Sequence, residues 1–214
     1  MAASESLLAN ILPAAVVRQL KSGRRHVADR HEEATVAFID FVSFTPFAER
    51  TEPERVVEVL DRAFSALDEL ATRFGVEKIK TLGDGYLAAA GVTEPRPDHA
   101  AAVAELALAT PDELRRCVGD DWPDLLTRIG IATGPVIAGV IGERRIGFDL
   151  WGDTVNTAAR MASHAAPGTI QLAEATARAL GSSHLLERRD DVEVKGKGRM
   201  STWLLLGRRS VPEA

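Results

Sequence analysis

The feature that most constrains the fold is a tight turn, Leu82-Gly-Asp-Gly-Tyr86, between two short apolar runs. Residues 76–80 precede this turn and residues 87–90 follow it, and both runs have the length of a strand. An Asp-Gly pair in this setting is a strong signal for a β-hairpin, whose two strands are antiparallel. We therefore expect an antiparallel strand pair, which excludes a purely parallel sheet.

Helical and extended patterns alternate along the rest of the chain. The β-branched and apolar residues 35–39 predict a buried strand that ends at Asp40. The longest apolar helical pattern predicts a helix over residues 53–74, opened by a Thr51/Glu54 capping box and ended by Gly75. This order predicts an α/β (α+β) sandwich with a mixed, mostly antiparallel sheet. Further helices are expected at 97–118, 151–164 and 173–180, and further strands at 127–133, 136–141, 192–194 and 202–206.

The length of 214 residues fits one domain with a short extension. Residues 4–21 predict a short amphipathic helix, in which Pro13 causes a break or kink. We therefore divide the chain into an N-terminal helical segment or linker (1–30), one domain (31–208) and a frayed tail (209–214).

Composition excludes several classes of function. The formal net charge is −5, so no broad basic surface for nucleic acid or anionic lipid is expected. No run of about 18 apolar residues is present to span a bilayer. Cys117 is the single cysteine, so an internal disulfide is impossible and a reducing compartment is expected. We interpret Cys117 as a small buried apolar residue.

Two aspartates stand at places where carboxylates could meet. Asp40 ends a predicted buried strand, and Asp84 lies at the tip of the predicted hairpin. Each has an ordinary explanation, because aspartate often caps the next element and is common before glycine in turns. The functional interpretation is a pair of carboxylates at adjacent strand ends. Mg²⁺ binds one or two protein carboxylates together with substrate phosphates, and two such ions can assist phosphoryl transfer.

Other polar residues could bind a ligand or could simply be solvated. Lys78 and Lys80 alternate around Ile79, so both are expected on one face of a strand and position alone does not choose between them. Asn156 and Arg160 lie four residues apart and share one face of a predicted helix. The other candidates each have a second explanation: a loop or capping role for Asp149, an edge charge for Arg128, and a flexible basic turn for Lys195.

Five segments, in order, resemble the class III nucleotidyl cyclase homology domain over roughly residues 33–207. Five motifs in order and at family-like spacing are far more specific than any single one. They are Phe38-Ile-Asp-Phe-Val-Ser-Phe-Thr45, Lys78-Ile-Lys-Thr-Leu-Gly-Asp84, Arg128-Ile-Gly-Ile-Ala-Thr-Gly134, Asp149-Leu-Trp-Gly-Asp-Thr-Val-Asn156 with Arg160, and Val194-Lys-Gly-Lys-Gly198.

This resemblance implies a ferredoxin-like nucleotide cyclase fold, working as a homodimer with shared active sites. It also implies two Mg²⁺ or Mn²⁺ ions as cofactors and a nucleoside triphosphate as substrate. The implied roles are as follows: Asp40, Asp84 and the Phe41 backbone hold the metals; Lys80 and Asp149 contact the purine; Asn156 orients the ribose; Arg160 stabilises the transition state; Arg128 and Lys195 hold the triphosphate; Phe44 and Thr45 bind substrate.

The implied base is adenine. Adenine has an acceptor at N1 and a donor amine, which a lysine and an aspartate match. Guanine would leave buried groups mispaired, at about 1–3 kcal/mol each. Guanylyl members typically carry glutamate and a small polar or thiol residue here. The alternatives are a guanylyl cyclase and an inactive nucleotide-binding regulatory module, but no metal aspartate or transition-state arginine is missing. The Gly83-Asp-Gly-Tyr86 turn does not match the turn of diguanylate cyclases.

Two features qualify the resemblance. Ser43 stands where the family often has glycine, and Phe41 stands where isoleucine is common.

Leu7-Leu-Ala-Asn-Ile-Leu-Pro13 resembles the helix that precedes the catalytic domain in membrane-anchored cyclases. We therefore expect the cytoplasmic domain of a membrane-anchored parent protein, with membrane contact only through segments absent from this chain and no nucleic-acid partner.

Overall fold

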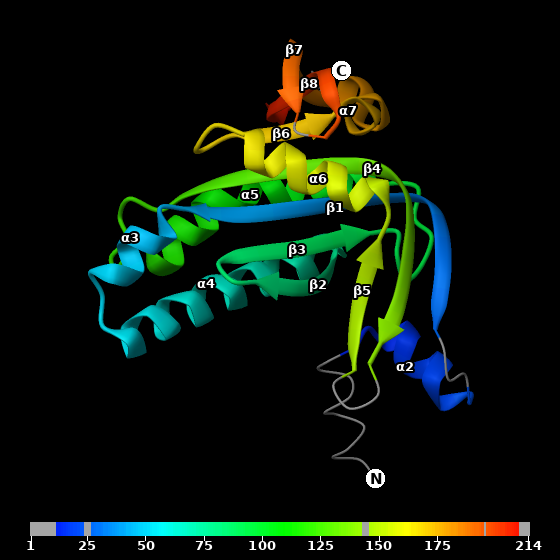
Figure 1. Cartoon of the computed structure of the whole chain (residues 1–214), viewed down its shortest axis with the longest axis horizontal. Helices are drawn as coiled ribbons and strands as arrows, with labels where there is room; N and C mark the ends of the chain where they lie inside the picture. Colours follow the sequence, from blue (N-terminus) through cyan, green and yellow to red (C-terminus); the bar gives the residue numbers. More distant parts are fainter. Residues whose placement is uncertain (1–11, 24–26, 143–145, 195, 210–214) are drawn as a thin grey trace, which may run out of the picture.

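The structure is a computed structural model, which describes residues 12–23, 27–142, 146–194 and 196–209. In this part of the chain, eight strands form one sheet in the order β2-β3-β1-β4-β6-β8-β7, with β5 paired to β4 (Figure 1). The strands are β1 Ala28–Val42, β2 Glu77–Leu82, β3 Gly85–Ala90, β4 Leu126–Ile141, β5 Gly147–Trp151, β6 Ile170–Ala173, β7 His184–Val194 and β8 Gly198–Arg208. The helices are α2 Ala14–Lys21, α3 Phe44–Glu49, α4 Pro53–Phe74, α5 His99–Val118, α6 Asp153–His164 and α7 Glu174–Leu180, followed by the short 3₁₀ helix η1 Gly181–Ser183.

The sheet is mixed and mostly antiparallel, which confirms the predicted fold class. Strands β4 and β6 run parallel, whereas the β2–β3, β1–β3, β1–β4, β4–β5, β6–β8 and β7–β8 pairs are antiparallel. The expected hairpin is formed by β2 and β3, with Leu82 opposite Gly85. The antiparallel pairing follows from the short turn between these two strands.

Apolar side chains pack on both faces of the sheet. One cluster joins the sheet to α4 and α5, and a second joins the opposite face to α2 and α6. Strand β1 contributes to both, because successive side chains of a strand point to opposite faces. Ile39 belongs to the first cluster and Val36 to the second, and neither is exposed to solvent. The strand expected around residues 35–39 is therefore buried on both faces, as predicted.

Two strand boundaries differ from the sequence prediction. Strand β1 continues to Val42, so Asp40 lies inside the strand and not at its end. Strand β4 is a single strand, although two strands separated at Gly134-Pro135 were expected. The physical reason is a bulge in β1 between His31 and Ala34, opposite Pro135. Pro135 has no N–H to donate to β1, and the bulge removes the ladder hydrogen bond that would otherwise need one. Strand β4 therefore continues past Pro135 without a break.

Helix starts were also placed imperfectly by the sequence. Helix α4 begins at Pro53 with Glu52 as its N-cap and no side-chain cap bond, so the predicted Thr51/Glu54 capping box is wrong. Proline fits the first helical position because it needs no N–H partner there. The end at Gly75 is confirmed, with φ of 64°. Helix α2 starts after Pro13, which is its N-cap and the position of the expected break, and residues 4–11 of the expected N-terminal helix lie outside the described residues. Cys117 is half-buried, not fully buried as expected.

Gly130 of β4 allows α6 to lie directly on the sheet. A Cβ atom at this position would be 1.9 Å from the backbone nitrogen of Ala162 and 2.3 Å from the carbonyl oxygen of Ala158. Only glycine permits such a close approach of two backbones. Helix α6 therefore rests on β4 and also packs against β1, as Figure 1 shows.

His99, at the start of α5, is buried beside the central strands. Its Nδ1 atom lies 2.8 Å from the Thr35 hydroxyl, which is 2.7 Å from the Thr133 hydroxyl. Burial lowers the pKa of His99, an effect that nearby Glu33 and Asp98 partly offset. The unfolded chain therefore binds a proton at a higher pH than the folded chain does.

We expect the stability of the fold to decrease as pH falls below about 6.5, the ordinary histidine value. Above that pH the contribution from neutral His99 is complete, and below it the slope can reach about 1.4 kcal/mol per pH unit. Urea unfolding of the wild type and of His99→Gln between pH 7.5 and 5.5 measures this. The variant should lose part of the slope, because glutamine does not titrate. Equal slopes would contradict the assignment.

Candidate active site

The two aspartates proposed for metal binding come from neighbouring strands. Asp40 lies in β1, where it is paired with Gly85 of β3 on one side and with Arg128 of β4 on the other. Asp84 occupies the β2–β3 turn and immediately precedes Gly85. The pairing of β1 with β3 therefore brings the two positions to the same end of the sheet. Their metal-binding role stays a prediction.

Arg128 already neutralises Asp40. One Nη atom of Arg128 donates to a carboxylate oxygen of Asp40 at 2.6 Å, and each side chain is about one-third exposed. The Arg128 Nε atom is buried and has no hydrogen-bond partner among the residues that the structure describes. The guanidinium thus retains an unused donor at this end of the sheet, next to the carboxylate.

Lys80 and Asp149 form an ion pair across two strands. The Lys80 ammonium donates to Asp149 at 2.5 Å, and the other oxygen of that carboxylate accepts the Leu150 amide at 2.8 Å. Asp149 lies in β5, a strand that the sequence analysis interpreted as a loop and the start of a helix. The pairing of β5 with the far half of β4 creates this strand, which brings Asp149 to Lys80.

A β-bulge decides which lysine of β2 reaches this position. Lys78 is opposite Ala88 and Lys80 is opposite Leu87, so the ladder shifts by one residue at Ile79. The expectation that both lysines share a face is therefore wrong, because a bulge breaks the alternation of side chains. Lys78 instead bonds Asp68 of α4 at 2.6 Å, on the opposite face of the sheet.

The segment after Asp40 is held by an aromatic cluster. Phe41 is buried and stacks on Phe64, and Trp122 contacts the rings of Phe41, Phe44 and Phe47. Ser43 has a φ of 61° and is the only non-glycine with positive φ in the described ranges. Glycine is favoured in this conformation, which explains why a family glycine would suit the position. Phe44 then begins α3, followed by the exposed Thr45.

Helix α6 places Asn156 and Arg160 on one face, as predicted. Asn156 is exposed and Arg160 is half-buried. Neither side chain forms a hydrogen bond within the described part of the chain, and no ion pair there joins Arg160 to Asp40 or Asp84. The β7–β8 turn approaches Arg160, because a Cβ at Gly196 would be 3.9 Å from its guanidinium. Lys195 lies outside the described residues.

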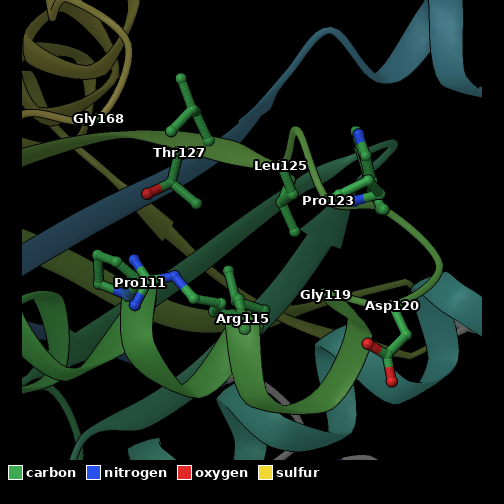
Figure 2. Close-up of a pocket in the computed structure, with 11 residues that line it drawn as sticks. Pro111, Arg115, Gly119, Asp120, Pro123, Leu125, Thr127 and Gly168 are labelled. Atoms are coloured by element: carbon green, nitrogen blue, oxygen red, sulfur yellow. The ribbon is translucent and has the colours of Figure 1, made fainter.

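No predicted site residue lines the pocket in Figure 2, whose volume is about 440 Å³. It lies between the end of α5 and the start of β4, where Pro111, Arg115 and Thr127 border it. Among the described residues, no three His, Cys, Asp or Glu side chains gather to hold a metal ion. A metal at Asp40 and Asp84 would thus need further oxygen ligands from backbone and substrate, as Mg²⁺ commonly does.

The family model for the adenylate and guanylate cyclase catalytic domain matches residues 26–207. The chain belongs to this family and is a class III nucleotide cyclase domain. It is 45% identical over 207 residues to an adenylate cyclase of Mycobacterium tuberculosis, covering 96% of this chain and 47% of the relative. It is 39% identical over 205 residues to the rat guanylate cyclase soluble subunit beta-2, covering 95% of this chain and 30% of that relative.

Solved structures agree with the fold. The guanylate cyclase domain of RhGC from Catenaria anguillulae, in complex with GTP, matches with a TM-score of 0.81 and 34% identity, over 85% of this chain and all of that one. The adenylyl cyclase CyaB from P. aeruginosa matches with a TM-score of 0.79 at 23% identity, over 86% and 97% of the two chains, and supports the fold alone. The chain spans about half or less of the curated relatives above. No described helix is long and apolar enough to cross a membrane.

Proposed function

We propose that this chain converts ATP into 3′,5′-cyclic AMP and pyrophosphate. The observation that carries the choice of ATP is the Lys80–Asp149 pair, which places a donor and an acceptor together at 2.5 Å. These two groups complement the N1 acceptor and the amine donor of adenine, whereas guanine would be mispaired. The 45% identity to an adenylate cyclase agrees with this choice.

The donor set of Asp40 and Asp84 fits two Mg²⁺ or Mn²⁺ ions, because both prefer carboxylate oxygens, with the Phe41 carbonyl as a further ligand. Bound metal ions would stabilise charge on the attacking and leaving oxygens. In the reaction, the ribose 3′-oxygen bonds to the α-phosphorus, its proton leaves, and the bond to pyrophosphate breaks. We assign Asn156 to the ribose, Arg160 to the charge of the transition state, and Arg128 and Lys195 to the triphosphate. Phe44 and Thr45 are assigned to substrate binding.

We further propose that the active site is shared between two copies of the chain. Within the described part of one chain, neither metal aspartate is hydrogen-bonded to Asn156 or Arg160. An antiparallel homodimer would supply the metal residues from one protomer and the base, ribose and transition-state residues from the other. We also propose that the parent protein is membrane-anchored, with this domain on its cytoplasmic side.

A guanylyl cyclase is the second candidate, favoured by the 39% identity to guanylate cyclase soluble subunit beta-2. Incubation with ATP or GTP and either metal, followed by identification of the product, separates the two. Cyclic AMP as the main product supports our proposal, and formation of cyclic GMP from GTP at a higher kcat/KM than that for ATP would overturn it. Formation of neither product would indicate an inactive nucleotide-binding module.

The double variant Lys80→Glu/Asp149→Cys tests the base contacts. We expect the ATP:GTP ratio of kcat/KM to fall by about 10- to 100-fold, because the matching donor and acceptor are lost. Efficient GTP use is not expected, since the surrounding side chains remain unchanged. Lys78→Glu is the matched control, because it breaks the Lys78–Asp68 pair on the other face of the same hairpin. An unchanged ratio in the double variant would show that these residues do not contact the base.

A further inference from the structure

A second ion pair holds the β7–β8 turn against α6. The Lys197 ammonium contacts both carboxylate oxygens of Asp153, which is the first residue of α6. Asp153 precedes Asn156 by three residues and Arg160 by seven, so all three lie on one face of the helix. The pair therefore occupies the face that carries the proposed ribose and transition-state residues.

The described residues of the turn are held by a buried residue that precedes it and by the ion pair of Lys197. Val194, which ends β7, is buried in the core cluster beneath α6, and its carbonyl accepts the Lys197 amide at 2.9 Å. Gly196 and Gly198 have φ values of 78° and 73°, which permit the tight reversal. With Lys197 bonded to α6, the backbone at Gly196 is held beside the Arg160 guanidinium.

This contact supplies a neighbour for Arg160, whose guanidinium has no hydrogen-bond partner in the described residues. An exposed ion pair adds little to stability, because water screens it. Asp153 is 79% exposed and Lys197 is 26% exposed. We therefore expect the ion pair to affect the position of the turn and of Arg160 more than the free energy of unfolding of the domain.

We propose that Asp153 and Lys197 are positioning residues that form a latch between α6 and the β7–β8 turn, and that the latch places Arg160 for the transition state. The inference rests on the proposed cyclase reaction and extends it to two residues outside the substrate and metal set. Asp153 also lies in the first turn of α6, where the helix dipole favours a carboxylate. The Lys197 ammonium, which bonds this carboxylate, is therefore held at the N-terminus of α6.

Asp153→Ala and Lys197→Ala should each lower kcat by about 10- to 100-fold, because displacing a catalytic group by about 1 Å has effects of that size. KM for the nucleotide should change by less than about threefold, since Arg160 acts on the transition state. Asp112→Ala is the matched control, because it removes an exposed ion pair to Arg115 on α5. The control should keep wild-type kcat, and the Tm of all three variants should stay within about 4 °C of wild type.

A double-mutant cycle separates positioning from a general structural effect. In an Arg160→Ala background, adding Asp153→Ala should cause less than about a twofold further loss, because the latch no longer has Arg160 to position. A loss as large as in the wild-type background would overturn the proposal, as would wild-type kcat in Asp153→Ala.

Amide hydrogen exchange tests the latch without activity, and so distinguishes its failure from failure of the proposed function. Exchange of the Lys197 amide should become about tenfold faster in Asp153→Ala and stay unchanged in Asp112→Ala, because local opening controls exchange. Unchanged exchange in Asp153→Ala would overturn the latch. If exchange rises but Arg160→Ala retains full activity, the role of Arg160 is wrong, and with it the catalytic purpose of the latch.

Discussion

Replacing Asp84 with alanine should lower cyclic nucleotide formation by about 10³-fold while leaving the fold intact. The metal ions are expected to stabilise the transition state by several kcal/mol, and each 1.36 kcal/mol corresponds to a factor of ten. Asp84 lies in the short turn between β2 and β3 and is only partly buried, so no core contact is lost. Turnover at saturating ATP and metal, with circular dichroism of the same sample, measures both effects.

Asp40 calls for a substitution of similar size, because its carboxylate is bonded to the Arg128 guanidinium. Asp40→Asn keeps the size and an acceptor oxygen for that donor but removes the negative charge, so the loss of activity should again be about 10³-fold. Asp120→Ala is the control for both variants, since Asp120 is an exposed acid in the loop after α5. Near-normal turnover in folded Asp84→Ala or Asp40→Asn would contradict the two-metal assignment.

Mixing two inactive variants should restore activity if the site is shared between protomers. Asp40→Asn lacks the metal site but carries an intact α6, whereas Arg160→Ala has the opposite defect. In a mixed dimer, one site holds both lesions and the other holds neither. At equal amounts and random pairing, about half of the dimers are mixed and each has one intact site, so recovery approaches about a quarter of wild-type activity.

The expected gain is therefore on the order of a hundredfold above either variant alone, given a loss of about 10³-fold for a metal aspartate. The measurement is a cyclic AMP assay after enough time for subunit exchange, which is confirmed separately. Mixing Asp40→Asn with Asp84→Ala is the matched control, because both lesions fall in the same half-site and no intact site forms. Specific activity should also fall on dilution as dimers dissociate. A mixture that stays inactive despite exchange would mean that each protomer holds a complete site.

The sequence alone determined the main elements and the candidate chemistry of this protein. The Asp-Gly turn predicted the β2–β3 hairpin, and the helical period predicted α4 with its end at Gly75. These signals are local, because residues close together in the sequence determine the type of a turn and the apolar face of a helix. The ordered motifs likewise named the cyclase family, which the family model then showed over residues 26–207.

Only the tertiary structure decided where several of these residues point. The bulge at Ile79 turns Lys80 toward Asp149 and leaves Lys78 to Asp68, although alternation predicts a shared face. The strand that carries Asp149 exists because β4 is long enough to pair with it, and Asp153 meets Lys197 across 44 residues of sequence. Such contacts depend on strand register and on the close seat of α6 over Gly130. Local sequence patterns do not encode them, because they arise from pairing between distant segments.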